Sequence, residues 1–175
     1  MFEVDAFVTR CRAALAEPKP MLAVKQILER TVSVPDALAS ALRAEPGAVV
    51  LHRSVELTVL SIVVPAGSRA SVPHDHRMWA VVGVYQGQED NQFFRRDGSG
   101  LVETGERSLR VSDTLAMGDE TIHAIRNPLD RHALAAIHVY GGDLLGAARS
   151  MFPPPDHREE PFDDKAVIGP GGYRS

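Results

Sequence analysis

The sequence has only one cysteine, Cys11, among its 175 residues. No disulfide can therefore form within the chain, and a reducing compartment such as the cytoplasm is the expected location. Cys11 lies in an amphipathic N-terminal stretch, where we interpret it as a small residue on a helix face. Acids and arginines interrupt the apolar positions of this stretch, which argues against a signal peptide. No apolar run approaches the ~20 residues of a membrane-spanning helix, so no membrane partner is expected.

Positive charge is also scarce. The chain has 19 Lys and Arg residues against 23 Asp and Glu residues, a net charge of −4, and no strongly basic stretch. Nucleic acid is therefore not an expected partner. The hydrophobic fraction of 44% is that of an ordinary globular protein. We expect one domain over residues 1–175, in which N-terminal helices (1–47) precede a β-barrel (48–149) and a C-terminal tail (150–175).

Apolar residues at three- and four-residue spacing predict helices at the N-terminus. The predicted helices cover residues 2–15, 21–30 and 33–45. Pro18 and Pro20 separate the first two, and Pro35 lies in the first turn of the third, a position that tolerates proline. Glu45-Pro46-Gly47 ends the third helix.

From Ala48 the pattern changes to short apolar and β-branched runs that are separated by turn residues, as in Pro65-Ala66-Gly67. The predicted strands cover residues 49–51, 57–64, 79–85, 92–95, 101–104, 108–111, 123–126 and 133–140. Many short strands at this spacing favour a mainly β fold, a barrel or a double-sheet jelly roll. The tail after Arg149 is polar and rich in proline and glycine. It either wraps the barrel or is partly disordered.

The histidines carry the first functional signal. His74 and His76 flank Asp75 in a segment that leads into a strand, where residues two apart point to the same face. Two imidazoles would then be directed at one point, and Asp75 would face away. A third nitrogen must come from elsewhere, and His123 is the best candidate, since it follows a turn and begins a strand, with Asn127 four residues later.

These residues resemble the two motifs of the cupin superfamily. The first motif reads Gly67…His74-Asp75-His76…Gly87, and the second reads Gly118…His123…Asn127. The resemblance implies a double-stranded β-helix barrel and a metal held by His74, His76 and His123.

The glutamate that most cupins place three or four residues after the second histidine is missing. Ala80 and Val81 occupy those positions, and neither can bind a metal. Three neutral nitrogens with open positions suit non-haem Fe(II), although zinc also accepts three histidines.

Three-histidine cupins are typified by the thiol dioxygenases, which this sequence resembles over roughly residues 50–150. Members of that family carry a His-x-Tyr element, which matches His138-Val139-Tyr140 here, fifteen residues after His123. The resemblance implies that the Tyr140 hydroxyl reaches the metal site and that His138 orients Tyr140. On a strand, both side chains share one face.

Mammalian-type cysteine dioxygenases link a cysteine five residues past the second histidine to this tyrosine. Val81 stands there, so the sequence is more similar to the bacterial branch. The stretches 78–85 and 138–143 also resemble a bacterial group of metal-dependent cupin enzymes with undefined substrates.

The resemblance implies that the enzyme adds O2 to a small carboxylated thiol, such as 3-mercaptopropionate or cysteine, and yields a sulfinate. An arginine is the natural partner for the substrate carboxylate. Arg149 and Arg53 are the two candidates, each at the position of a carboxylate-binding arginine in one branch of the family. Trp79 is a candidate for the pocket wall.

Two other functions remain open at this point. One is a three-histidine dioxygenase that acts on a carbon centre, and the other is a metal- or ligand-sensing cupin without turnover. The protein is expected to be a monomer or a homodimer.

Overall fold

The computed structural model describes residues 1–42, 45–169 and 172–174. Its helices are α1 (Val4–Ala14), α2 (Pro20–Val32), α3 (Pro35–Ala41) and the short α4 (Asp164–Ile168). Prolines begin α2 and α3, where a missing backbone N–H leaves no hydrogen bond unmade. The third helix ends at Ala41, earlier than predicted, and residues 43 and 44 of the predicted helix lie outside the described residues. None of the described helices is long and apolar enough to cross a membrane.

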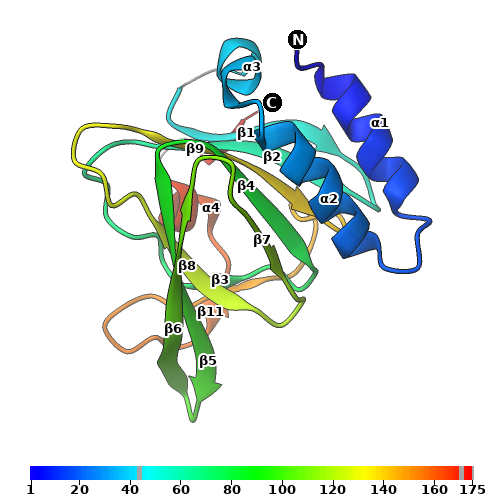
Figure 1. Cartoon of the computed structure of the whole chain (residues 1–175). Coiled ribbons are helices and arrows are strands. Elements are labelled where there is room, and N and C mark those ends of the chain that lie inside the picture. The colour runs from blue at the N-terminus through cyan, green and yellow to red at the C-terminus, as the bar shows by residue number, and fades with distance from the viewer. Residues whose placement is uncertain (43–44, 170–171, 175) are drawn as a thin grey trace.

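The strands form two sheets of six strands each (Figure 1). In spatial order, the first sheet consists of β12 (Tyr173–Arg174), β1 (Gly47–Arg53), β2 (Thr58–Val64), β9 (Leu134–Tyr140), β4 (Ala80–Gln86) and β7 (Thr114–Met117). The second sheet consists of β11 (Glu160–Pro161), β10 (Ser150–Met151), β3 (His74–Asp75), β8 (Ile122–Arg126), β5 (Gln88–Asp97) and β6 (Gly100–Arg110). Among the described residues, all strand pairings are antiparallel except that of β1 with β12. The predicted jelly-roll barrel with N-terminal helices is confirmed.

Strand β9 shows how the barrel is built. All seven of its residues are buried, because one face meets the helices and the other faces the barrel interior. Ala135, Ile137 and Val139 pack with the helices, whereas Ala136 and Tyr140 belong to the interior cluster. A strand covered on both faces reads as a continuous apolar run, as this one does in the sequence.

The helices cover the outer face of the first sheet, as the blue ribbons in Figure 1 show. Helix α2 crosses β4 at Gly83, where a Cβ atom would lie only 2.8 Å from Leu28 Cγ and from Val32 Cγ1. Glycine therefore allows the helix to approach the strand closely. Because the helices cover the outer face, a binding site on this sheet must lie on its interior face.

Cys11 lies fully buried in the cluster between the helices and the sheet, and desolvation raises the pKa of its thiol from 9.0 to about 12. Because the thiolate is the reactive form, we expect no reaction of native protein with a disulfide reagent at pH 8. One thiol per chain should react after unfolding in guanidinium. A spectrophotometric thiol titration checks this, and rapid labelling of native protein would contradict the packing of α1.

The C-terminal tail wraps the barrel in its described part. Strands β10 and β11 extend the second sheet, and β12 pairs with β1 through Ala48 and Tyr173 in the first sheet. Helix α4 lies between these pairings, with the Asp163 side chain accepting two backbone N–H groups at its start. The tail therefore runs from one sheet to the other.

Candidate metal centre and cavity

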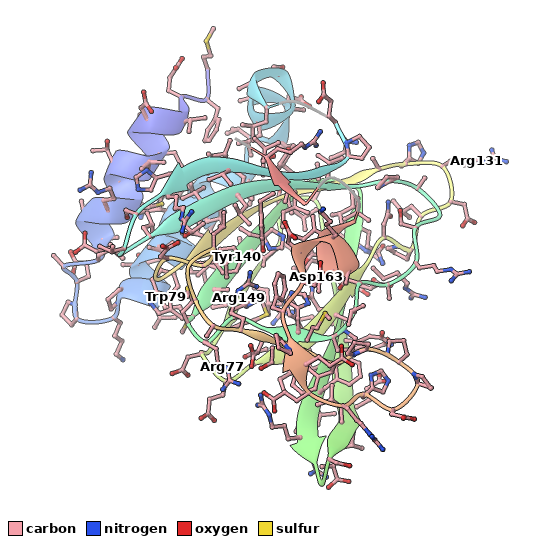
Figure 2. All side chains as sticks on the ribbon, turned by 180° about the vertical axis from the view of Figure 1, so that it is seen from behind. Arg77, Trp79, Arg131, Tyr140, Arg149 and Asp163 are labelled. Carbon is pink, nitrogen blue, oxygen red and sulfur yellow. The ribbon has the colours of Figure 1, made fainter. Side chains whose placement is uncertain are left out.

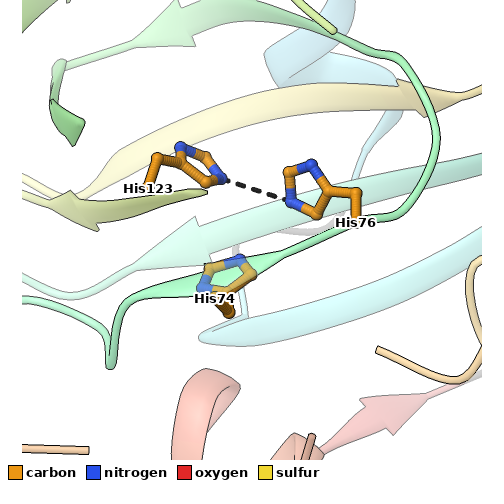
Figure 3. A group of neighbouring side chains, drawn as sticks. All are labelled: His74, His76 and His123. Atoms are coloured by element: carbon orange, nitrogen blue, oxygen red, sulfur yellow. Dashed lines mark hydrogen bonds between the residues drawn. The ribbon is translucent and has the colours of Figure 1, made fainter. Parts of the chain in front are cut away.

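His74 and His123 lie directly opposite each other on the paired strands β3 and β8. His76 follows two residues after His74, just beyond the end of β3, and its ring lies 5.3 Å from that of His74 and 4.9 Å from that of His123. All three side chains are buried. Figure 3 shows the three imidazoles converging from two segments of the chain that are about 50 residues apart in sequence.

The ring nitrogens are arranged for metal binding. One nitrogen from each ring lies within 4.8 Å of the other two, and the Nε2 atoms of His76 and His123 are 3.2 Å apart. The Nδ1–H of His74 donates to the Val72 carbonyl at 2.9 Å, and that of His123 donates to Asn91 Oδ1 at 2.8 Å. These bonds leave both Nε2 atoms as lone-pair donors directed at one point, as in metal-binding histidines generally.

Burial also keeps the three imidazoles neutral. Desolvation lowers the pKa of His74 to about 4. The pKa values of His76 and His123 lie well below the ordinary value, first because of desolvation and then because the neighbouring histidines repel a further positive charge. Neutral imidazole is the form that binds a metal.

Asp75 points away from the histidines, as predicted. Its buried carboxylate pairs with Arg77 at 2.8 Å and Arg96 at 3.2 Å, and accepts the Ser150 N–H at 2.9 Å. Among the described residues, the cluster therefore offers three nitrogens and no carboxylate oxygen. This donor set fits a divalent metal such as Fe(II) or Zn(II) with open coordination positions.

Tyr140 and His138 lie beside the cluster on the interior face of β9. The Tyr140 ring centroid is 5.0 Å from that of His76, and the Tyr140 hydroxyl is 3.2 Å from His138 Nδ1. Burial raises the pKa of Tyr140 well above its ordinary value, so the phenol keeps its proton. The structure thus brings both residues of the His-x-Tyr element to the three histidines.

Arg149 is the one arginine of the two candidates that lies at the cluster. Its side chain is buried, its Nη2 donates to the Tyr173 hydroxyl at 3.1 Å, and its guanidinium stacks 3.6 Å from the centre of the Phe162 ring. Its Nε has no hydrogen-bond partner, and no carboxylate in the described part of the chain forms an ion pair with it. A buried cation without a counter-ion is costly, which indicates a site for an anionic ligand.

These side chains share one cavity of about 410 Å³. The polar end contains the three histidines, His138, Tyr140 and Arg149, and the rest of the wall is largely apolar, including Leu60, Ile62, Ile125 and Val167. The tail supplies part of that wall through Phe162, α4 and Tyr173. Figure 2 shows α4, which begins just after the labelled Asp163, close to Arg149 and Tyr140.

Arg53 and Trp79 lie elsewhere. Arg53 is on the surface, where its Nε and Nη2 bind the two oxygens of Asp143 at 2.7 and 3.0 Å. Trp79 packs against Gly141, whose Cβ, if present, would lie 2.0 Å from the indole, and it contacts the cluster beneath the helices. Neither residue lines the cavity.

Four residues of the site were not singled out from the sequence: Glu89, Asn91, Phe162 and Tyr173. Glu89 and Asn91 lie two residues apart on β5, so period two directs both side chains to one face of the strand, and both are fully buried. Phe162 and Tyr173 are the only aromatic residues of the tail after Phe152, and nothing in the sequence indicates that they return to the barrel.

Comparison with known proteins gives no family model that matches the chain. Similar solved structures include DMSP lyase DddQ from Ruegeria pomeroyi DSS-3, with 21% identity and a TM-score of 0.42 over 55% of this chain and 43% of the lyase. An RmlC-like cupin from Methanocaldococcus jannaschii with a double-stranded β-helix fold has 12% identity and a TM-score of 0.48, covering 61% and 91%. Hydroquinone 1,2-dioxygenase from Sphingomonas sp. TTNP3 has 15% identity and a TM-score of 0.45, covering 60% and 72%. At these levels the likenesses carry no argument about activity, and function has to be inferred from the site.

Proposed function

We propose that the protein is an Fe(II)-dependent dioxygenase that converts a small carboxylated thiol and O2 into a sulfinate. The observation that carries the proposal is the buried Arg149, which lines the same cavity as His74, His76 and His123 and forms no ion pair with a carboxylate in the described part of the chain. A ligand that has an anionic group at Arg149 and a metal-seeking group at the histidines fits both ends. A mercapto acid is such a ligand.

His74, His76 and His123 would hold the iron, which when bound supplies the redox chemistry between O2 and sulfur. Both oxygen atoms end on the sulfur, which loses four electrons while O2 gains four, so that no further reductant is needed. Arg149 would hold the carboxylate through charge-assisted hydrogen bonds. The Tyr140 hydroxyl would lie at the reacting end of the substrate, and the apolar wall would exclude water.

The cavity also bears on substrate size. A volume of about 410 Å³ is at the lower end of the ~300–1,000 Å³ range of ligand pockets. It admits mercapto acids that carry an apolar group in addition to the thiol and the carboxylate. Leu60, Ile62 and Ile125 would contact such a group.

A panel of thiols tests the activity. We expect the Fe(II)-loaded protein to consume O2 with mercapto acids such as 3-mercaptopropionate and cysteine, and to do so much more slowly with cysteamine, which has no carboxylate for Arg149. An oxygen electrode measures uptake, and mass spectrometry should find the product 32 Da heavier, as addition of both oxygen atoms requires. Absence of uptake across the panel would favour a dioxygenase acting on carbon or a sensor without turnover.

A further inference from the structure

Glu89 is a fully buried carboxylate on β5, with no exposed surface. It forms no ion pair with Lys or Arg in the described part of the chain; its one close basic neighbour is His138. Burying a carboxylate in this way is unfavourable unless both of its oxygens are satisfied. The partners of those two oxygens therefore show what the residue does.

The first oxygen leads to the metal centre. Glu89 Oε1 accepts a hydrogen bond from Asn91 Nδ2 at 2.9 Å. This bond fixes which end of the Asn91 amide faces His123, so that Asn91 Oδ1 accepts the proton of His123 Nδ1 at 2.8 Å. With its proton on Nδ1, His123 presents a free lone pair on Nε2 to the other histidines.

The second oxygen leads to Tyr140. Glu89 Oε2 lies 3.3 Å from His138 Nε2, and in the described part of the chain neither atom makes a hydrogen bond of regular geometry. At this distance a proton on Nε2 would be attracted to the carboxylate oxygen, whereas a bare lone pair on Nε2 would be repelled by it, so the contact favours the tautomer with the proton on Nε2. In neutral His138 the Nδ1 lone pair is then free to accept the Tyr140 hydroxyl, 3.2 Å away.

We propose that Glu89 is a positioning residue that sets two side chains of the site at once, His123 through Asn91 and Tyr140 through His138. The His123 branch concerns the metal centre alone. The functional meaning of the Tyr140 branch rests on the proposed function, because it is under that proposal that the Tyr140 hydroxyl contacts a substrate.

The chemistry of the two branches explains why the residue is a carboxylate. Both branches need an acceptor, and a carboxylate is an acceptor at each end. The isosteric amide of Glu89→Gln accepts at one end only and donates at the other. If its NH2 group faces His138, the imidazole must move its proton to Nδ1, and Tyr140 can no longer donate there. If the NH2 group faces Asn91, the Asn91 amide turns over, and His123 loses the acceptor for its Nδ1 proton.

The experiment measures both branches without any thiol. In Zn(II)-loaded wild-type protein, the ¹⁵N chemical shifts of the imidazoles should show a proton on His138 Nε2. In Glu89→Gln, either that proton moves to Nδ1 or the Zn(II) affinity falls by about tenfold or more, the loss typical when the partner of a metal ligand is removed. Zn(II) affinity is measured by competition with a chelator.

Asp90→Asn is the matched control. It makes the same change of charge and size one residue along β5, where the side chain turns outward to Arg126 at 2.8 Å. It should change neither measurement.

The proposal is overturned if His138 Nε2 carries no proton in wild-type protein, a result that needs no variant. It is also overturned if Glu89→Gln leaves both the His138 proton and the Zn(II) affinity unchanged. Neither result depends on whether the protein oxidises thiols.

Discussion

Replacing His123 with alanine is expected to remove most of the metal from the purified protein. His123 supplies one of only three nitrogens in the cluster, and the described residues offer no carboxylate to replace it. Removing a partner that merely orients a ligand costs about 10–100-fold in affinity, and removal of the ligand itself should cost more. Elemental analysis should find up to one iron per chain in the wild-type protein and little in His123→Ala.

His132→Ala is the control for this measurement. His132 is an exposed histidine on the loop before β9, and within the described residues only its backbone carbonyl takes part in a hydrogen bond, which it accepts from Asn127. Its iron content should match that of the wild-type protein. Equal iron in the His123 variant, or a wild-type protein that binds no added Fe(II), would contradict the metal centre and the proposed function with it.

The three histidines illustrate how far the sequence alone leads. Period two places His74 and His76 on one side of the chain, and it places His138 and Tyr140 on one face of β9, as the structure shows. Strand pairing, which the sequence does not specify, sets His123 directly opposite His74. Local sequence patterns therefore predict which residues belong to the site, but they do not predict the distances between the side chains.

Local sequence patterns do not distinguish the two candidate arginines. Arg53 and Arg149 each matched a position known for carboxylate binding, and only tertiary contacts separate them. Asp143 neutralises Arg53 on the surface, 90 residues away in sequence, while Arg149 is buried against Phe162. Ion pairs and stacking between distant segments have no local signal.

Prediction of the fold from the sequence has similar limits. The strand predicted at 108–111 is the end of one long strand, β6, and the short strand β7 was not predicted. Ser112, with a φ of 74°, makes the sharp turn between them, a conformation that serine adopts rarely. The tail was predicted to wrap the barrel or to be partly disordered, and the pairing of β12 with β1 shows that its described part wraps.

Replacing Arg149 with alanine is expected to lower kcat/KM for a mercapto acid by about 10- to 1,000-fold, with the iron content unchanged. Charge-assisted hydrogen bonds contribute ~1.5–3 kcal/mol each, and a carboxylate held by the guanidinium would lose them. The loss should be far smaller for cysteamine, because it has no carboxylate. Arg149→Lys should recover only part of the rate, since an ammonium group cannot bind both oxygens in the geometry of the planar guanidinium.

Arg149 also contacts the tail, so its loss could act through the packing of the tail instead of the substrate. Tyr173→Phe separates the two causes, because it removes the hydroxyl that accepts from Arg149 Nη2 and keeps both the ring and the guanidinium. It should reduce kcat/KM much less than Arg149→Ala does. An equal loss in both variants, for cysteamine as well as for mercapto acids, would assign the effect to the tail.

Arg53→Ala decides between the two arginines. Its guanidinium binds Asp143 outside the cavity, so the variant should keep near wild-type kcat/KM with every thiol. Steady-state oxygen uptake with a mercapto acid and with cysteamine makes the comparison for all four variants. A severe loss in Arg53→Ala with near-normal activity in Arg149→Ala would mean that the substrate carboxylate does not bind at Arg149. The buried Arg149 guanidinium would then be expected to bind a different anion.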